Sequence, residues 1–148
     1  MKDITTSILS VLVAAILCLL VITDFGLTQY KEDQFNCLDA AETFVDRVVD
    51  AAEINDYFLT ELNNAVSSSH GVYTTEVNKY TVVSNSVPGG GTYITEYLGK
   101  TTDKLVTGDR IEVVVKVIRY PSSMTLIGGL TGVAGSNMRM FKVSGTVR

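Results

Sequence analysis

The sequence predicts an α+β protein in which a long N-terminal helix carries a short second helix and a small antiparallel β-sheet. Three observations predict this class. An uncharged apolar run over residues 4–23 continues into a helical pattern that reaches Ile54. A second helical pattern covers roughly residues 56–68. From Tyr73 onward the chain is rich in Thr, Val and Tyr, and its apolar residues recur with a period of two.

The apolar run ITTSILSVLVAAILCLLVIT, residues 4–23, has no charged side chain. As a helix it would be about 30 Å long, which matches the hydrocarbon core of a bilayer. It could be a signal peptide, an uncleaved anchor or a buried core helix. A signal peptide has a basic start and a small-residue cleavage site. Here Asp3 offsets Lys2 and no Ala-x-Ala pattern follows the run. We therefore favour an uncleaved anchor.

Residues 24–54 continue the helix with an amphipathic pattern. Apolar residues recur mostly at three- and four-residue steps: Leu27, Tyr30, Leu38, Ala41, Val45, Val48 and Ala52. Most charged residues, among them Asp33, are expected to lie off this stripe. No proline precedes Pro88, and Gly26 is the one position at which the helix could bend.

The chain thus divides into an anchor over residues 1–23, a helical part over 24–71 and a β-sheet domain over 72–148. The acids that follow the anchor, Asp24 and Glu32 among them, favour a single-pass arrangement with the C-terminal domain outside the cell membrane.

The second helix is expected to begin with Asp56 as its N-cap and to end with Gly71 as its C′ residue. His70, the only histidine, is expected to interact with the last carbonyl groups of this helix.

Four segments have the composition of strands: 73–84, 92–98, 110–120 and 138–147. Glycine- and proline-containing turns separate them, which favours antiparallel pairing. In the third, Ile111, Val113, Val115 and Val117 share one face, and the apolar stripe of residues 38–52 is the expected cover for that face.

Charge is distributed unevenly along the chain. Residues 24–61 hold ten acids and two bases, and residues 62–148 hold five acids and nine bases, so the balances are −8 and +4. The acidic helix argues against nucleic acid as its partner. Either the acids are a solvated face, or they pair with basic patches on neighbouring copies.

No catalytic motif is present. The sequence has no CxxC, HExxH, EF-hand or phosphate-loop pattern, so we expect no enzyme activity, no cofactor and no metal site. Cys18 and Cys37 would be about 28 Å apart on one helix, which excludes an intramolecular disulfide. Both are expected to be small apolar helix residues, with an intermolecular Cys37 bridge as the alternative.

Residues 121–137, PSSMTLIGGLTGVAGSN, form a long apolar stretch without a charge. Such loops often carry function, and exposed apolar residues often mark a contact surface. The candidate contact residues are Met124, Leu126, Ile127, Leu130 and Val133.

The whole chain resembles a type IV pilin or pseudopilin, and is most similar to the small pilin-like proteins of tight-adherence (Tad) secretion systems. The resemblance rests on the apolar segment Ile4–Thr23, its continuation as an amphipathic helix over Phe25–Ile54, and a C-terminal sheet that ends at Arg148. Two features depart from the family pattern. No glycine precedes Gly26 to end a leader, and Thr5 stands where the family usually carries Glu. Either a leader has already been removed or this member is not processed.

The resemblance implies a structural subunit that waits in membrane lipid and assembles into an extracellular filament or pseudopilus. Its implied partners are copies of itself, other pilin-like subunits and the pilus assembly machinery. The residues expected to mediate assembly are Asp3, Ile8, Leu12, Ile16, Leu20, Leu38, Ala41, Val45 and Val48. Asp3 could neutralise Lys2 or the amino terminus of a neighbour. The alternative is a non-polymerising, membrane-anchored binding or sensor domain that uses loop 121–137.

Overall fold

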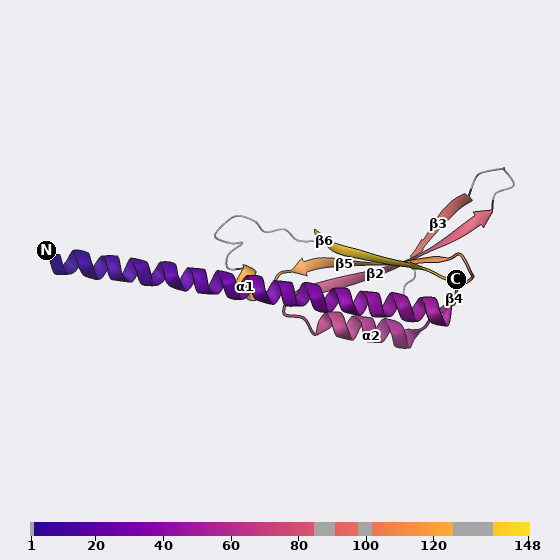
Figure 1. Cartoon of the computed structure of the whole chain (residues 1–148), viewed down its shortest axis with the longest axis horizontal. Coiled ribbons are helices and arrows are strands. Elements are labelled where there is room, and N and C mark those ends of the chain that lie inside the picture. The colour runs from indigo at the N-terminus through magenta and orange to yellow at the C-terminus, as the bar shows by residue number, and fades with distance from the viewer. Residues whose placement is uncertain (1, 85–90, 98–101, 126–137) are drawn as a thin grey trace.

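The computed structural model, which describes residues 2–84, 91–97, 102–125 and 138–148, confirms the α+β class (Figure 1). Helix α1 (Lys2–Ala51) is a rod whose N-terminal half projects away from everything else. The described residues after α1, which we call the head, lie beside its C-terminal half. They form β1 (Glu53–Ile54), α2 (Asp56–Ser67), β2 (Val72–Ser84), β3 (Gly91–Tyr97), β4 (Asp103–Lys104), β5 (Arg110–Arg119) and β6 (Met138–Thr146).

Helix α1 ends three residues before the predicted boundary at Ile54. Ala52 takes a left-handed backbone conformation with φ of 51°, which costs about 1 kcal/mol in a residue with a Cβ and ends the helix. The next two residues, β1, pair with β4, and the amide of Leu105 donates to the carbonyl of Ala52 at 2.8 Å. Strands this short leave no period in the sequence, so the β1–β4 pair was not predicted.

Both predicted caps of α2 are wrong. The N-cap is Asn55, whose extended backbone lets its Oδ1 accept a hydrogen bond from the amide of Phe58 at 2.9 Å. Asp56 is instead the first helical residue. At the other end the C-cap is Ser68, and Gly71 lies beyond the helix with a different role, described below.

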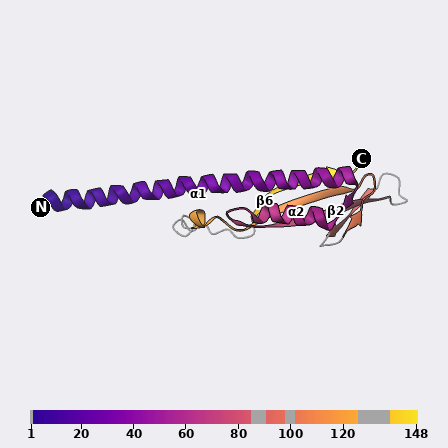
Figure 2. The same cartoon turned by 90° about the horizontal axis from the view of Figure 1, so that it is seen from below.

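The four predicted strands form one antiparallel sheet in the order β3-β2-β5-β6, with bounds within one residue of the predicted ones. Both helices lie on the same face of this sheet (Figures 1 and 2), with α1 against β5 and β6 and α2 against β2. The predicted inward residues of β5, from Ile111 to Val117, are almost fully buried.

The other face of the sheet is covered by ion pairs between neighbouring strands. Lys142 of β6 lies 2.7 Å from Glu112 of β5, and Lys116 of β5 pairs with Glu76 of β2. Val114 of β5 lies between Glu76 of β2 and Lys142 of β6 in the strand register, and it is 3% exposed although it alternates with the residues that face the helices.

Gly145 of β6 allows α1 to approach the sheet closely. A Cβ at this position would lie 2.6 Å from Val45 Cγ1 and 2.9 Å from Val49 Cγ2, both on α1. Since Val45 is buried, it has little room to move away.

We therefore expect Gly145→Ala to lower the free energy of unfolding of the head by about 1–3 kcal/mol, because overpacking forces the helix and the sheet apart. The measurement is urea unfolding of the full chain in detergent micelles, followed by tyrosine fluorescence. Thr146→Ala is the matched control, since Thr146 is exposed and its change should stay within about 0.5 kcal/mol. Equal stability of the two variants would contradict close packing at Gly145.

Candidate membrane and assembly surface

The N-terminal half of α1 is apolar and uncovered. Among the described residues, α1 is long and apolar enough to cross a membrane, and no residue of its most apolar 18-residue segment is buried. The large apolar side chains between Ile4 and Ile22 are from 38% to 69% exposed. An all-round apolar helix is stable in lipid or among other apolar helices rather than in water. This half of α1 is therefore the first candidate site.

Four of the residues expected to mediate assembly lie on this uncovered half and are exposed: Ile8, Leu12, Ile16 and Leu20. The side chain of Asp3 is outside the described part of the structure, so its expected role in neutralising a neighbour stays a prediction.

The other expected assembly residues have a different role. Ala41, Val45 and Val48 are at most 3% exposed and belong to the core that α1 makes with the head's own sheet, and Leu38 is half-buried beside them. Because the apolar stripe of residues 38–52 is already covered, these side chains are not available to a neighbouring subunit. The stripe does not extend down to Leu27, which is 43% exposed.

A buried carboxylate, Asp33, fastens the head to α1. Expected on the solvated face, it is instead fully buried. Its oxygens accept hydrogen bonds from the amides of His70 and Gly71, both at 2.8 Å, and from the hydroxyl of Tyr73 at 2.7 Å. His70 Nδ1 lies 2.9 Å from Oδ1 of the same carboxylate. We call these four residues the Asp33 cluster.

The Asp33 cluster also corrects the expected roles of His70 and Gly71. His70 contacts the carboxylate of α1 and not the carbonyl groups that end α2. A side chain at position 71 would clash with its neighbours, because a Cβ there would lie 2.7 Å from the Tyr73 hydroxyl and 2.8 Å from the Arg119 carbonyl. Glycine at this point lets its amide reach Asp33.

The electrostatics of the cluster follow from its donors. Burial by itself raises the pKa of Asp33, but the hydrogen bonds from Tyr73, His70 and Gly71 outweigh it, and the net shift is downward. Burial and the neighbouring carboxylate both raise the pKa of Tyr73, which keeps its hydroxyl protonated as a donor. Asp33 is therefore held as an anion.

A second set of contacts joins the head to α1 closer to its uncovered half. The sequence Pro121–Thr125 ends in a helical turn, which we call the 121–125 turn. Ser123 Oγ donates to Gln29 Oε1 at 2.7 Å, and the rings of Tyr30 and Tyr120 meet edge to face at 5.5 Å. Helix α1 continues through Gly26, so the glycine does not break it. A Cβ there would lie 3.2 Å from Ser123 Oγ, so the glycine makes room for the turn.

The expected contact loop is only partly described. Met124 is half-buried against Gly26, whereas Leu126, Ile127, Leu130 and Val133 lie outside the described residues. The loop's role as a contact surface stays a prediction.

Several bases of the head are paired within the chain. Lys79 is buried, with its Nζ 2.8 Å from Asp103, and Lys116 and Lys142 form the sheet pairs described above. On the helices, Arg47 of α1 pairs with Glu61 of α2. Each of these pairs joins an acid and a base of the same region, so the balances of −8 and +4 are unchanged, and the expected attraction between copies stays a prediction.

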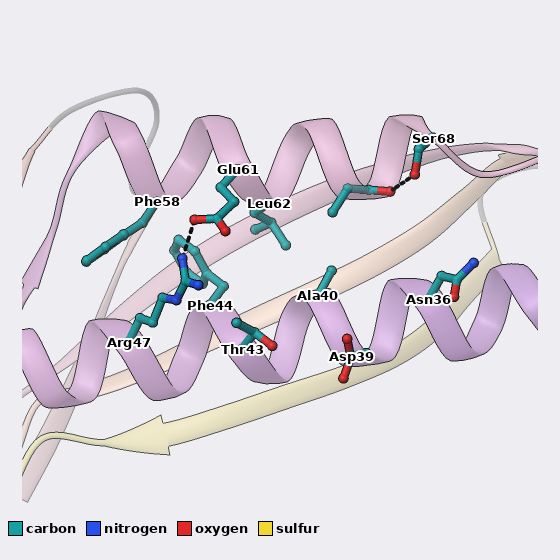
Figure 3. Close-up of a pocket in the computed structure, with 11 residues that line it drawn as sticks. Asn36, Asp39, Ala40, Thr43, Phe44, Arg47, Phe58, Glu61, Leu62 and Ser68 are labelled. Carbon is teal, nitrogen blue, oxygen red and sulfur yellow. Dashed lines mark hydrogen bonds and ion pairs between the residues drawn. The ribbon is translucent and has the colours of Figure 1, made fainter.

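A groove of about 300 Å³ lies between α1 and α2 (Figure 3). Its floor is apolar, with Phe44 and Leu62 between the helices. Arg47 and Glu61 bridge the groove toward the Phe58 end, and Asn36 and Asp39 lie toward the Ser68 end. A volume of about 300 Å³ is at the lower end of the range for small-molecule pockets. Nothing in the sequence pattern indicated it, because it depends on the angle at which α2 returns along α1.

The cysteines and acids provide no further site in the part of the chain that is described. Cys18 is exposed on the apolar half of α1, and Cys37 is buried, with its Sγ 3.5 Å from Ser69 Oγ. No group of three or more His, Cys, Asp or Glu residues that could hold a metal ion occurs among the described residues.

Comparison with known proteins provides no relative from which to transfer a function: no family model, curated protein or solved structure matches the chain.

We expect Asp33→Asn to lower the free energy of unfolding of the head by about 2–3 kcal/mol at neutral pH, because amide donors replace a charged acceptor that faces three donors. The folded-state pKa of Asp33 lies below its unfolded value of about 3.9, so its contribution is complete above pH 4 and is lost as the pH falls through the folded pKa. Urea unfolding of the wild-type and Asp33→Asn chains in micelles, from neutral pH down into acid, measures the effect.

The stabilities of the two chains should converge in acid. Glu32→Gln is the matched control, since it removes an exposed acid one position away and should change stability by less than about 0.5 kcal/mol. A constant gap between wild type and Asp33→Asn down to the lowest pH would show that the carboxylate's charge is not what the cluster uses.

Proposed function

We propose that this chain is a pilin-like structural subunit, anchored in the membrane by α1 and assembled through the same helix into an extracellular filament or pseudopilus. The observation that carries the proposal is the division of α1 into an uncovered apolar half and a half whose apolar stripe, residues 38–52, is covered by its own head. We propose a structural role and not an enzymatic one.

The uncovered half suits two environments. Its apolar surface is continuous around the helix, so either lipid or other copies of α1 can cover it. The head cannot fold back over it, because the Asp33 cluster and the stripe of residues 38–52 hold the head beside the other half. Subunits can therefore leave lipid and enter a bundle of α1 helices without refolding.

Assembly into a filament follows from an asymmetric contact. If one copy contacts the next by a shift along α1 and a rotation that does not close, repetition produces a helical filament with apolar helix halves in its centre and heads outside. The resemblance to Tad-type pilin-like proteins supports this arrangement, with the head outside the cell and with other pilin-like subunits and the assembly machinery as partners.

The second candidate function is a membrane-anchored binding domain that does not polymerise. The groove between α1 and α2 favours it, since about 300 Å³ bordered by charged and apolar groups could hold a small ligand. In that reading α1 is an anchor only, and its exposed residues contact lipid and no other copy.

We expect Ile16→Asp to abolish surface filaments, because a carboxylate on the uncovered half costs about 2.5–3.5 kcal/mol at the centre of a membrane helix. The measurement is electron microscopy and immunoblotting of filaments sheared from the surface of cells that express the full chain. Ile16→Leu is the matched control and should assemble as wild type.

Fractionation of the same cells separates assembly from anchoring. Wild-type chain in the membrane fraction but never in sheared filaments would favour the binding domain. Normal filaments from Ile16→Asp would contradict the proposal. Ala41→Glu is not a useful test, since Ala41 lies in the core of the head and its replacement would unfold the subunit.

A further inference from the structure

The 121–125 turn reaches further toward the N-terminus of α1 than any other described part of the head. Figures 1 and 2 both show this turn, in orange, beside α1 and displaced from the sheet toward the uncovered half. Its contacts with α1 fix this position, since Ser123 bonds to Gln29 and the turn packs on Gly26.

The height of these contacts relative to a bilayer can be derived from the helix. If residues 4–23 span the hydrocarbon, Gly26 lies three residues beyond it, or about 5 Å, and Tyr30 lies about 10 Å beyond it. The headgroup layer on each side of a bilayer is about 5–8 Å thick. The contact with Gly26 therefore falls within the headgroup layer, and the backbone of Tyr30 lies just beyond it.

The composition at this height suits an interface between lipid and water. Tyrosine is enriched in such interfaces because its ring is apolar and its hydroxyl is polar. Phe25, the residue before Gly26 on α1, is 59% exposed, and Met124 in the turn is half-buried. The turn itself, PSSMT, has no charged residue, so none of its own side chains opposes contact with the interface.

We propose that the 121–125 turn is a second membrane contact of this subunit, seated in the headgroup layer beside α1. This inference rests on the proposed anchoring by α1 and adds to it a fixed orientation. With α1 alone the whole subunit could tilt in any direction, whereas a second contact on one side of α1 holds that side against the membrane. The partner is the bilayer surface, because the turn is continuous with the apolar surface that enters it.

A depth measurement in lipid tests this proposal. The full chain, with Cys18 and Cys37 replaced by alanine, receives a single cysteine in place of Ser122 or Thr125, which are exposed residues of the turn. An environment-sensitive fluorophore is attached, and the protein is placed at low density in phosphatidylcholine–phosphatidylglycerol vesicles that carry headgroup nitroxides. Phe25→Cys is the reference within the interface, and Thr102→Cys, exposed in the loop before β4, is the reference in water.

We expect nitroxide lipids to quench the labels at positions 122 and 125 as strongly as the label at 25, and to leave the label at 102 unquenched. Quenching at 25 alone would overturn the membrane contact of the turn while leaving the anchor intact. Quenching at none of these positions would overturn the anchor and this inference together. If the labels in the turn respond only when the protein density is raised, the turn contacts a second copy, and the proposal is also overturned.

Discussion

One buried carboxylate positions the head on the rod. Asp33 occupies a fully buried position on α1, where an apolar residue is usual. Its burial is possible because the amides of His70 and Gly71 and the hydroxyl of Tyr73 donate hydrogen bonds to it. A shift of the head by one helical turn would leave three donors and one anion without partners. Such losses cost several kcal/mol, so the cluster fixes the register between helix and head far more sharply than apolar packing alone.

The division of α1 into two halves follows from that register. Above Asp33, the apolar residues Cys37, Ala41, Phe44, Val45 and Val48 of α1 are buried in the core that the head completes. Below it, the contacts described for the head are those of Tyr120 and the 121–125 turn. From Phe25 toward the N-terminus every large apolar side chain in the described part is exposed. Two apolar surfaces that look alike in the sequence thus have different roles. One is buried within the subunit, and the other is available to lipid or to neighbouring copies.

The sequence predicted the elements better than the contacts between them. The strand bounds followed from the period of two and from turn residues, both of which are local signals, and the stripe of residues 38–52 correctly indicated the cover of the sheet. The N-cap of α2 was misassigned because Asn55 and Asp56 are both good N-caps, and it is Asn55 that has the extended backbone of a cap while Asp56 is already helical. Asp33 and Gly71 were misassigned, and the role of Gly26 in making room for the turn was missed, for a common reason. Each is explained by a partner at least thirty-seven positions away, which no periodicity reports.

The side-by-side attachment of the head has a mechanical consequence. A pull directed along the rod would travel through the hydrogen bonds of α1, which has no break between Lys2 and Ala51. It would reach the head through the 121–125 turn, the Asp33 cluster and the contact of Gly145 with Val45, which lie one after another along the helix. Such a load shears these contacts together and does not peel them one at a time. The attachment should therefore resist tension along the axis better than a force applied across it.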